Sequence, residues 1–173
     1  MPSSTAATTP ASEPAARLLR VPMTLWFRLV RDLCRRGDGR RESGAFLLGT
    51  RGAGGDDVKV YIPYDDLDPH AFDTGVVVMT GSGFAALWAR CRELRLEVLG
   101  DVHTHPGEAF QSETDRTNPM MSERGHLALI LPRYAASWGF LFRGVGIYEY
   151  AGRYQWRDWS GPRRRARVRF SWK

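Results

Sequence analysis

Cysteine is scarce in this sequence, and long apolar runs are absent. Only Cys34 and Cys91 occur among 173 residues, which excludes a disulfide framework and a cysteine metal cluster. The longest apolar candidates, Leu127–Leu131 and Val76–Met79, have the length of strands and fall far short of the roughly 18 residues of a membrane span. The N-terminus also lacks the basic and apolar regions of a secretory signal. We therefore expect a soluble cytoplasmic protein with two reduced thiols and no membrane partner.

Acidic residues are missing from the C-terminal end of the chain. Residues 163–173 hold six basic and no acidic residues, whereas residues 1–162 hold 19 of each. The net charge of +6 is therefore expected to come from a basic tail and not from a folded face. Because nucleic-acid-binding domains usually carry their charge as a patch on the fold, nucleic acid is not the partner we expect. A basic tail can still contact nucleic acid, acidic proteins or lipid head groups.

The composition divides the chain into three parts. Residues 1–17 are rich in Ser, Thr, Ala and Pro, and such a segment buries too little apolar area to order itself. One domain is expected over residues 18–160, where the periodic apolar patterns lie. Residues 161–173 then form the basic C-terminal tail.

The apolar periodicity of the middle part alternates between helices and strands. Thr24 is a candidate N-cap for an amphipathic helix over Leu25–Arg36, and a second helix is predicted over Ser82–Arg95. The predicted strands are Leu18–Pro22, Glu42–Thr50, Val58–Pro63, Thr74–Thr80, Glu97–Thr104, His126–Pro132, Phe140–Arg143, Val145–Tyr150 and Arg153–Trp156. Irregular chain is expected over Asp65–Asp73 and Pro106–Ser122. This order favours an α+β fold with helices packed on a central sheet.

Two histidines stand two residues apart at the end of the predicted strand Glu97–Thr104. Because side chains alternate across a strand, His103 and His105 point to the same face, where they form a natural pair of zinc ligands. Pro106 ends the strand, and Asp115 follows ten residues after His105. Two histidines and one carboxylate leave a fourth position for water, as in a catalytic rather than a structural zinc site.

Each of these residues also has a purely structural interpretation. Pairs of histidines with this spacing are common in proteins that bind no metal. Ser112 and Asp115 have the S-x-x-D spacing of a helix capping box. Glu42 could be a solvated charge beside two arginines. His126 is interpreted as a core or edge histidine, and His70 as a solvent-exposed one.

In combination, these residues resemble the JAMM family, the metalloprotease branch of the MPN domain. That family carries a Glu in an E-x-x-G-x-L-x-G-like strand, then H-[ST]-H-P, then S-x-x-D. This chain has Glu42 in ESGAFLLG, then HTHP from His103, and then Ser112 and Asp115. The first glycine of the Glu42 strand comes one place early, and six rather than the usual seven residues separate His105 from the serine.

The resemblance implies a fold and a set of site residues. The MPN fold has a central mixed, mostly antiparallel β-sheet flanked by two main helices. Glu42 would accept a proton from the attacking water, and Ser112 would donate a hydrogen bond to the oxyanion. Asp101, which shares the strand face of the histidines, either orients one of them or is simply solvated. One Zn²⁺ per chain would be bound by His103, His105 and Asp115.

The same resemblance implies a substrate class. JAMM enzymes cleave after the C-terminal glycine of ubiquitin or a ubiquitin-like protein, and compact bacterial members accompany E1-like and E2-like enzymes, including those of antiphage systems. We therefore expect a zinc-dependent isopeptidase or precursor-processing peptidase. The alternatives are a sulfur-carrier-type peptidase that releases cysteine or a peptide from a ubiquitin-like carrier, a non-catalytic MPN scaffold, and a protein that binds or processes nucleic acid through the basic tail and the zinc.

Overall fold

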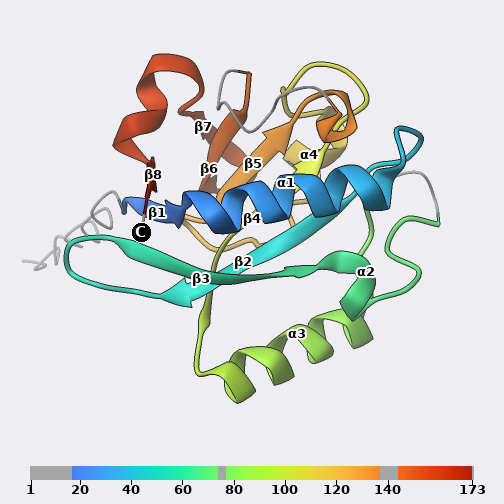
Figure 1. Ribbon diagram of the computed structural model, residues 1–173, viewed down its shortest axis with the longest axis horizontal. Coiled ribbons are helices and arrows are strands. Elements are labelled where there is room, and N and C mark those ends of the chain that lie inside the picture. Colours follow the sequence, from blue (N-terminus) through green and yellow to red (C-terminus); the bar gives the residue numbers. More distant parts are fainter. Residues whose placement is uncertain (1–16, 74–76, 137–143, 173) are drawn as a thin grey trace, which may run out of the picture.

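A mixed β-sheet forms the centre of the molecule (Figure 1). The computed structural model describes residues 17–73, 77–136 and 144–172. Within these ranges eight strands lie side by side in the order β7-β6-β5-β4-β2-β3-β1-β8. The strands are β1 (Leu19–Pro22), β2 (Gly44–Thr50), β3 (Asp56–Pro63), β4 (Glu97–Thr104), β5 (Leu127–Leu131), β6 (Gly146–Gly152), β7 (Gln155–Asp158) and β8 (Val168–Ser171). The helical elements are α1 (Met23–Gly37), α2 (Tyr64–Leu67), α3 (Gly81–Leu94), α4 (Glu113–Thr117), η1 (Arg133–Ala135) and η3 (Gly161–Ala166).

The pairing of the strands is mostly antiparallel. β2 runs antiparallel to both β3 and β4, and β6 runs antiparallel to both β5 and β7. The parallel pairs are β4 with β5 and β1 with both β3 and β8. The predicted α+β fold, with a mixed and mostly antiparallel sheet flanked by two main helices, is confirmed.

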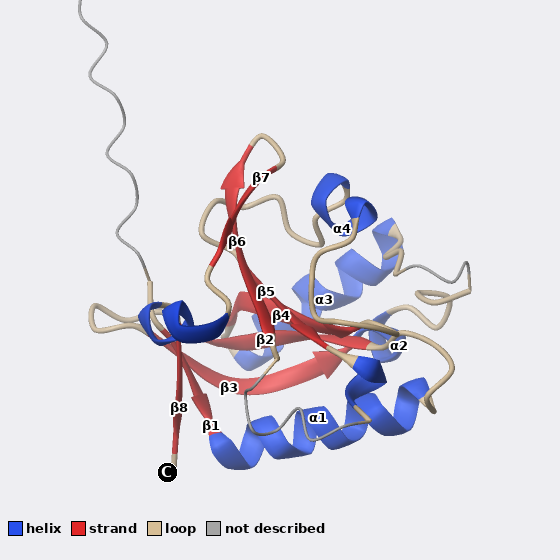
Figure 2. Cartoon of the chain, turned by 90° about the horizontal axis from the view of Figure 1, so that it is seen from above, coloured by secondary structure: helices blue, strands red, loops and turns tan. Residues whose placement is uncertain are grey.

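The two main helices cover opposite faces of the sheet (Figure 2). Alternate residues of β2 explain this, because Leu47 lies in the core beneath α1 whereas Phe46 and Leu48 lie in the core beneath α3. α1 contributes Leu29 and other buried side chains to the first core, and α3 contributes Leu87 to the second. Both cysteines are free thiols, as predicted. Among the described residues no helix is long and apolar enough to cross a membrane.

The structure moves several predicted boundaries. α1 begins at Met23, so Pro22 is its N-cap and the prediction of Thr24 in that role is wrong. The helix starts without a side-chain cap, because the proline side chain has no oxygen that could accept a hydrogen bond from the first turn. β2 begins at Gly44, and Glu42 therefore lies just before the strand rather than in it.

The predicted strand Thr74–Thr80 is not part of the sheet. Residues 74–76 lie outside the described residues, and Val77–Thr80 run as irregular chain. The Asp68 carboxylate accepts hydrogen bonds from the Thr80 amide and hydroxyl at 2.9 and 2.5 Å, which ties the N-cap of α3 to the end of α2. Asp68 itself follows α2, a short helix that overlaps the loop predicted over Asp65–Asp73. The predicted strand Phe140–Arg143 lies outside the described residues.

The C-terminal segment belongs to the fold and is not a free tail. β8 pairs in parallel with β1 and forms one edge of the sheet, so the expected boundary at residue 160 is wrong. Val168 is buried in the first core, and the Phe170 ring lies 5.0 Å from the Trp26 ring. Arg167 is also buried and pairs with the Glu149 carboxylate at 2.7 Å. In the sequence, Val168 and Phe170 alternate with Arg167 and Arg169. The charge of these arginines obscured the strand pattern.

Candidate metal centre

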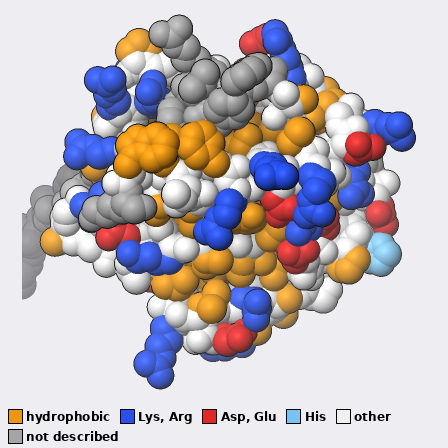
Figure 3. All heavy atoms as spheres, viewed as in Figure 1, with side chains coloured by type: hydrophobic (Ala, Val, Ile, Leu, Met, Phe, Trp, Pro, Cys, Tyr) orange, Lys and Arg blue, Asp and Glu red, His pale blue; other side chains and the backbone are white. Residues whose placement is uncertain are grey.

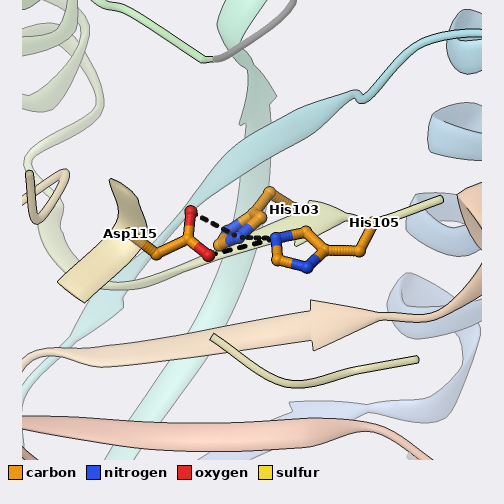
Figure 4. Close-up of side chains that lie close together, drawn as sticks. All are labelled: His103, His105 and Asp115. Carbon is orange, nitrogen blue, oxygen red and sulfur yellow. Dashed lines mark hydrogen bonds and ion pairs between the residues drawn. The ribbon is translucent and has the colours of Figure 1, made fainter. Parts of the chain in front are cut away.

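Two imidazole rings meet beside the end of β4, where the chain turns toward Pro106. His103 and His105 point to the same side, as the strand alternation predicts, and their Nε2 atoms lie 3.1 Å apart (Figure 4). The backbone here is held on both sides, since His103 pairs with Gly44 of β2 and the His105 amide donates to the Leu131 carbonyl of β5. Both side chains are buried, at 8% and 7% exposure. The two rings are thus presented by the most central part of the sheet.

The third group comes from the short helix α4. Asp115 places one carboxylate oxygen 3.2 Å from the His105 Nε2 atom and the other 3.6 Å from the His103 Nε2 atom (Figure 4). The capping box is also real: Ser112 is the N-cap, its hydroxyl accepts from the Asp115 amide, and its own amide donates to the Asp115 carboxylate. The structural and the metal-binding interpretations of Asp115 are therefore compatible, because the cap aims the carboxylate at the histidines.

The three side chains fit a divalent metal ion. Their ligand atoms all lie within 4.8 Å of one another. Tetrahedral zinc with bonds of about 2.0–2.1 Å separates its ligand atoms by roughly 3.3–3.4 Å. The distance between the two Nε2 atoms and the distance from each to its nearer Asp115 oxygen are close to this value. Two neutral nitrogen donors and one carboxylate are a donor set that zinc accepts. His103, His105 and Asp115 can therefore hold a metal together.

The charges of this cluster reinforce one another. Burial opposes ionisation of Asp115, but hydrogen bonds with His103 and His105 outweigh burial and hold the pKa of this carboxyl far below its usual range. Burial likewise disfavours the charged form of His103, yet hydrogen bonds to Asp101 and Asp115 raise the pKa of this imidazole to about 10. Without a metal, His103 is therefore protonated and supplies the positive charge between the Asp101 and Asp115 carboxylates.

Asp101 lies behind His103 and is almost fully buried. Its exposure is 1%, so the alternative that it is a solvated charge is wrong. One carboxylate oxygen lies 2.6 Å from the Nε2 atom of His126, and the other accepts from the Tyr64 hydroxyl at 2.9 Å. The second oxygen also lies 3.4 Å from the Nδ1 atom of His103. Burial raises the pKa of Asp101, but the histidine hydrogen bonds dominate and bring it to about 2.

The sequence predicts His126 as a core or edge histidine and does not link it to the site. His126 is buried, at 6% exposure, and its ring partner is Asp101. It precedes β5, and the parallel pairing of β5 with β4 brings it beside Asp101. No local sequence signal indicates this pairing. His70, by contrast, is exposed as predicted, and its ring contacts Asp73.

Glu42 interacts electrostatically with all three residues of the cluster. It is half-buried and precedes Ser43, which exchanges hydrogen bonds with Thr104, the residue between the two histidines. Burial raises the pKa of the Glu42 carboxyl, nearby His105 and His103 lower it, and Asp115 raises it again. The carboxyl therefore shares the electrostatic environment of the proposed ligands.

A cavity opens next to the cluster and continues as an apolar groove. His103 and Asp115 line the cavity together with Gln111 and Trp156. The buried side-chain amide nitrogen of Gln111 has no hydrogen-bond acceptor within the part of the chain that the structure describes. The adjoining groove shares four residues with the cavity and extends over Met79, Phe84 and the exposed Tyr154; the shared residues are Val77, Asn118, Pro119 and Met120. An extended chain could lie along this groove and end beside Asp115.

Comparisons with known proteins agree with this picture. The family described as prokaryotic homologs of the JAB domain matches residues 26–140. A protein of Sinorhizobium fredii named probable metalloprotease y4jG is 32% identical over 63 residues, which are 36% of this chain and 38% of that protein's length. The chain thus matches less than half of this relative.

Two solution structures of bacterial proteins share the fold. A protein from Desulfitobacterium hafniense has a TM-score of 0.61 at 13% identity, covering 90% of this chain and 94% of its own. A protein from Salinibacter ruber has a TM-score of 0.55 at 18% identity, covering 80% of this chain and 87% of its own.

Proposed function

Because the chain belongs to the family of prokaryotic homologs of the JAB domain, we propose that it is a zinc-dependent peptidase that cleaves after the C-terminal glycine of a ubiquitin-like protein. The family and the relative named as a probable metalloprotease support a metallopeptidase-like role. The observation that carries the proposal is the convergence of His103, His105 and Asp115 with Glu42 alongside.

The proposed mechanism assigns one task to each group. Bound Zn²⁺ would polarise the scissile carbonyl and lower the pKa of a coordinated water to about 7. Glu42 accepts the proton of the attacking water and returns it to the leaving amine, a task that suits a half-buried carboxyl with a raised pKa. No serine or cysteine nucleophile is needed.

Two donors are available for the developing oxyanion. The Ser112 hydroxyl donates to the Asp115 carboxylate at 2.9 Å in the structure, so it must turn away to reach a substrate oxygen. The Gln111 amide lines the same cavity without an acceptor among the described residues, and it can donate without breaking a bond. We assign the first role to Ser112 and an assisting role to Gln111.

The apolar groove supports a polypeptide substrate. Its lining includes residues of α4, which carries Asp115, and of α3, and an extended tail placed there presents its last carbonyl group to the metal centre. Glycine residues at the end of a ubiquitin-like protein have no side chains to obstruct the cavity. We extend the proposal to a cytoplasmic bacterial conjugation system with E1-like and E2-like enzymes, in line with the family resemblance.

Cleavage of defined fusions tests the proposal. Ubiquitin-like proteins, each fused through the C-terminal glycine to a reporter protein, are incubated with the zinc-loaded chain. We expect Glu42→Gln to lower turnover by about 10²–10⁴-fold while zinc stays bound. Glu93→Gln, on the exposed side of α3, serves as the matched control and should cleave like the wild type. A zinc-loaded wild type that cleaves no fusion and no isopeptide conjugate would favour the scaffold alternative.

A further inference from the structure

We propose that His126 and Tyr64 are positioning residues of the metal centre, which act on the ligand His103 through the buried carboxylate of Asp101. The inference rests on the metal site of the proposed function but not on any substrate. It assigns a role to two residues outside the motif that predicted the site.

The first step is the orientation of His103. Its Nε2 atom faces His105 and Asp115, so its Nδ1 atom must face away from the metal position. The Asp101 carboxylate lies 3.4 Å from that Nδ1 atom. A histidine ligand that donates its second ring proton to a carboxylate is fixed in one tautomer and one ring orientation. Asp101 is thus in place to select the Nε2-binding form of His103.

The second step concerns what holds Asp101. Its side chain is buried, and an unpaired buried carboxylate would be costly. His126 supplies the shortest contact, at 2.6 Å, and since an ionised carboxylate only accepts, the His126 Nε2 atom is the donor. The His126 backbone is itself fixed, because its amide donates to the Glu123 carbonyl and its carbonyl accepts from the Tyr150 amide of β6. The Asp101 carboxylate therefore has an anchor on the neighbouring strands.

The third step concerns Tyr64, which contacts the other carboxylate oxygen of Asp101. The Tyr64 hydroxyl donates to the Asp101 oxygen that faces His103, at 2.9 Å. The Tyr64 ring is fully buried and packs edge-on against Phe46, with ring centroids 4.8 Å apart. It also covers Gly44, the strand partner of His103, so closely that a Cβ atom there would overlap the ring. Two rigid groups from separate elements thus fix both oxygens of Asp101.

Metal titration of four variants tests this role. His126→Leu removes the donor, His126→Gln retains an amide donor, and Tyr64→Phe removes only the hydroxyl. Leu29→Ala is the matched control, since it opens the buried core under α1, on the other face of the sheet from Tyr64. Zn²⁺ affinity is measured against a competing chelator, and the visible absorption spectrum of the Co²⁺-loaded protein reports the ligand geometry. Thermal melting of the metal-free proteins records the stability of each variant.

We expect His126→Leu to weaken zinc binding by about 10–100-fold and to change the Co²⁺ spectrum. His126→Gln should restore most of the zinc affinity and most of the wild-type Co²⁺ spectrum. Leu29→Ala should melt at a lower temperature but keep the wild-type zinc affinity and Co²⁺ spectrum. Wild-type zinc affinity and spectrum in His126→Leu, or equal losses in the Leu and Gln variants, would overturn the proposal. If His126→Leu does not fold, Tyr64→Phe decides, because wild-type affinity and an unchanged spectrum in it would overturn the shared positioning role.

The wild-type titration separates this inference from the proposed function. A wild type that binds no metal would defeat the metal site of the proposed function and the inference with it. A wild type that binds zinc but cleaves nothing leaves the positioning test intact. A wild type that binds zinc and cleaves, next to a His126→Leu variant with wild-type affinity and spectrum, defeats the inference alone.

Discussion

The Asp115 carboxylate has two roles, one in capping helix α4 and one in the candidate metal centre. Its amide and carboxylate close the capping box with Ser112, and the same carboxylate faces both histidine Nε2 atoms. A helix of five residues has little stability of its own, so its cap decides where the ligand lies. The cap is therefore part of the site and not a competing explanation for the S-x-x-D motif.

Ser112→Ala separates the two roles of the hydroxyl. Loss of the cap should lower the free energy of unfolding by about 1 kcal/mol. Loss of an oxyanion donor should lower kcat by a further factor of about 10²–10³. Thermal melting and turnover of a fusion substrate are measured in parallel, with Ser112→Thr as the variant that keeps a hydroxyl. A decrease in stability with unchanged kcat would show that the hydroxyl is only a cap.

The charge on His103 makes zinc binding depend on pH. Its ordinary pKa of 6.5 is raised to about 10 in the metal-free fold, so protonation stabilises that fold fully below pH 6.5, and this contribution is lost as the pH rises through about 10. A metal must displace that proton from the Nε2 atom. The Zn²⁺ affinity should therefore rise with pH, by up to about tenfold per unit below pH 10.

Calorimetric titration with Zn²⁺ in buffers of different ionisation enthalpy counts the protons released. Near neutral pH we expect about one proton from His103. Asp101→Asn should release fewer, because it removes one of the two carboxylates that raise the His103 pKa. An affinity that does not change with pH would show that His103 is already neutral before the metal binds.

At the scale of elements, the contact between β2 and α2 depends on the absence of a side chain at Gly44. A Cβ atom at this position would overlap the Tyr64 ring at the start of α2 and meet the Val102 carbonyl oxygen of β4 at 3.0 Å. The glycine at this position therefore makes room for the Tyr64 ring, whose hydroxyl donates to Asp101.

Gly44→Ala should therefore destabilise the fold by about 1–3 kcal/mol, because an overpacked interior site forces neighbouring groups to shift. Chemical denaturation measures this change. Gly81→Ala is the control, since a Cβ atom there would meet no heavy atom within 4 Å and the residue opens a helix. Equal stability of Gly44→Ala and the wild type would show that the Tyr64 ring can move without loss.

Local sequence patterns correctly predicted the elements whose structure depends on residues that are close in the sequence. The strand Glu97–Thr104 was predicted with the bounds of β4, and the histidine alternation placed two ligands correctly on one side. The strand predicted over Thr74–Thr80 is not found over Val77–Thr80, because an apolar run is also compatible with irregular chain whose last residue is hydrogen-bonded to Asp68. His126 could not be linked to Asp101, since their contact depends on a parallel pairing between distant segments.

At the scale of the whole molecule, the basic charge lies on a folded edge of the sheet. Figure 3 shows Lys and Arg side chains gathered beside hydrophobic ones at the upper left of the view, where Figure 1 places β8 and the helical turn before it. Arg163, Arg165 and Arg169 are exposed, whereas Arg167 is buried against Glu149 and Trp159. A count of charges does not distinguish an exposed arginine from a buried and paired one. The sequence alone therefore predicted a basic tail for the whole segment.

Deletion of residues 161–173 should therefore destabilise the domain. It removes β8 from β1, takes Val168 out of the core, and leaves the Glu149 carboxylate without Arg167. Breaking one buried ion pair alone typically costs about 3–5 kcal/mol, which corresponds to a fall in Tm of roughly 6–20 °C for a chain of this size.

Circular dichroism melting compares the shortened chain with a full-length variant in which Arg163, Arg165 and Arg169 are all replaced by Ser. The variant loses the three arginines of this segment that are exposed but keeps β8 and the Arg167–Glu149 pair, so its Tm should stay close to that of the wild type. A shortened chain that melts like the wild type would mean that the sheet is complete without β8. A low Tm in both proteins would mean instead that the exposed arginines themselves stabilise this edge.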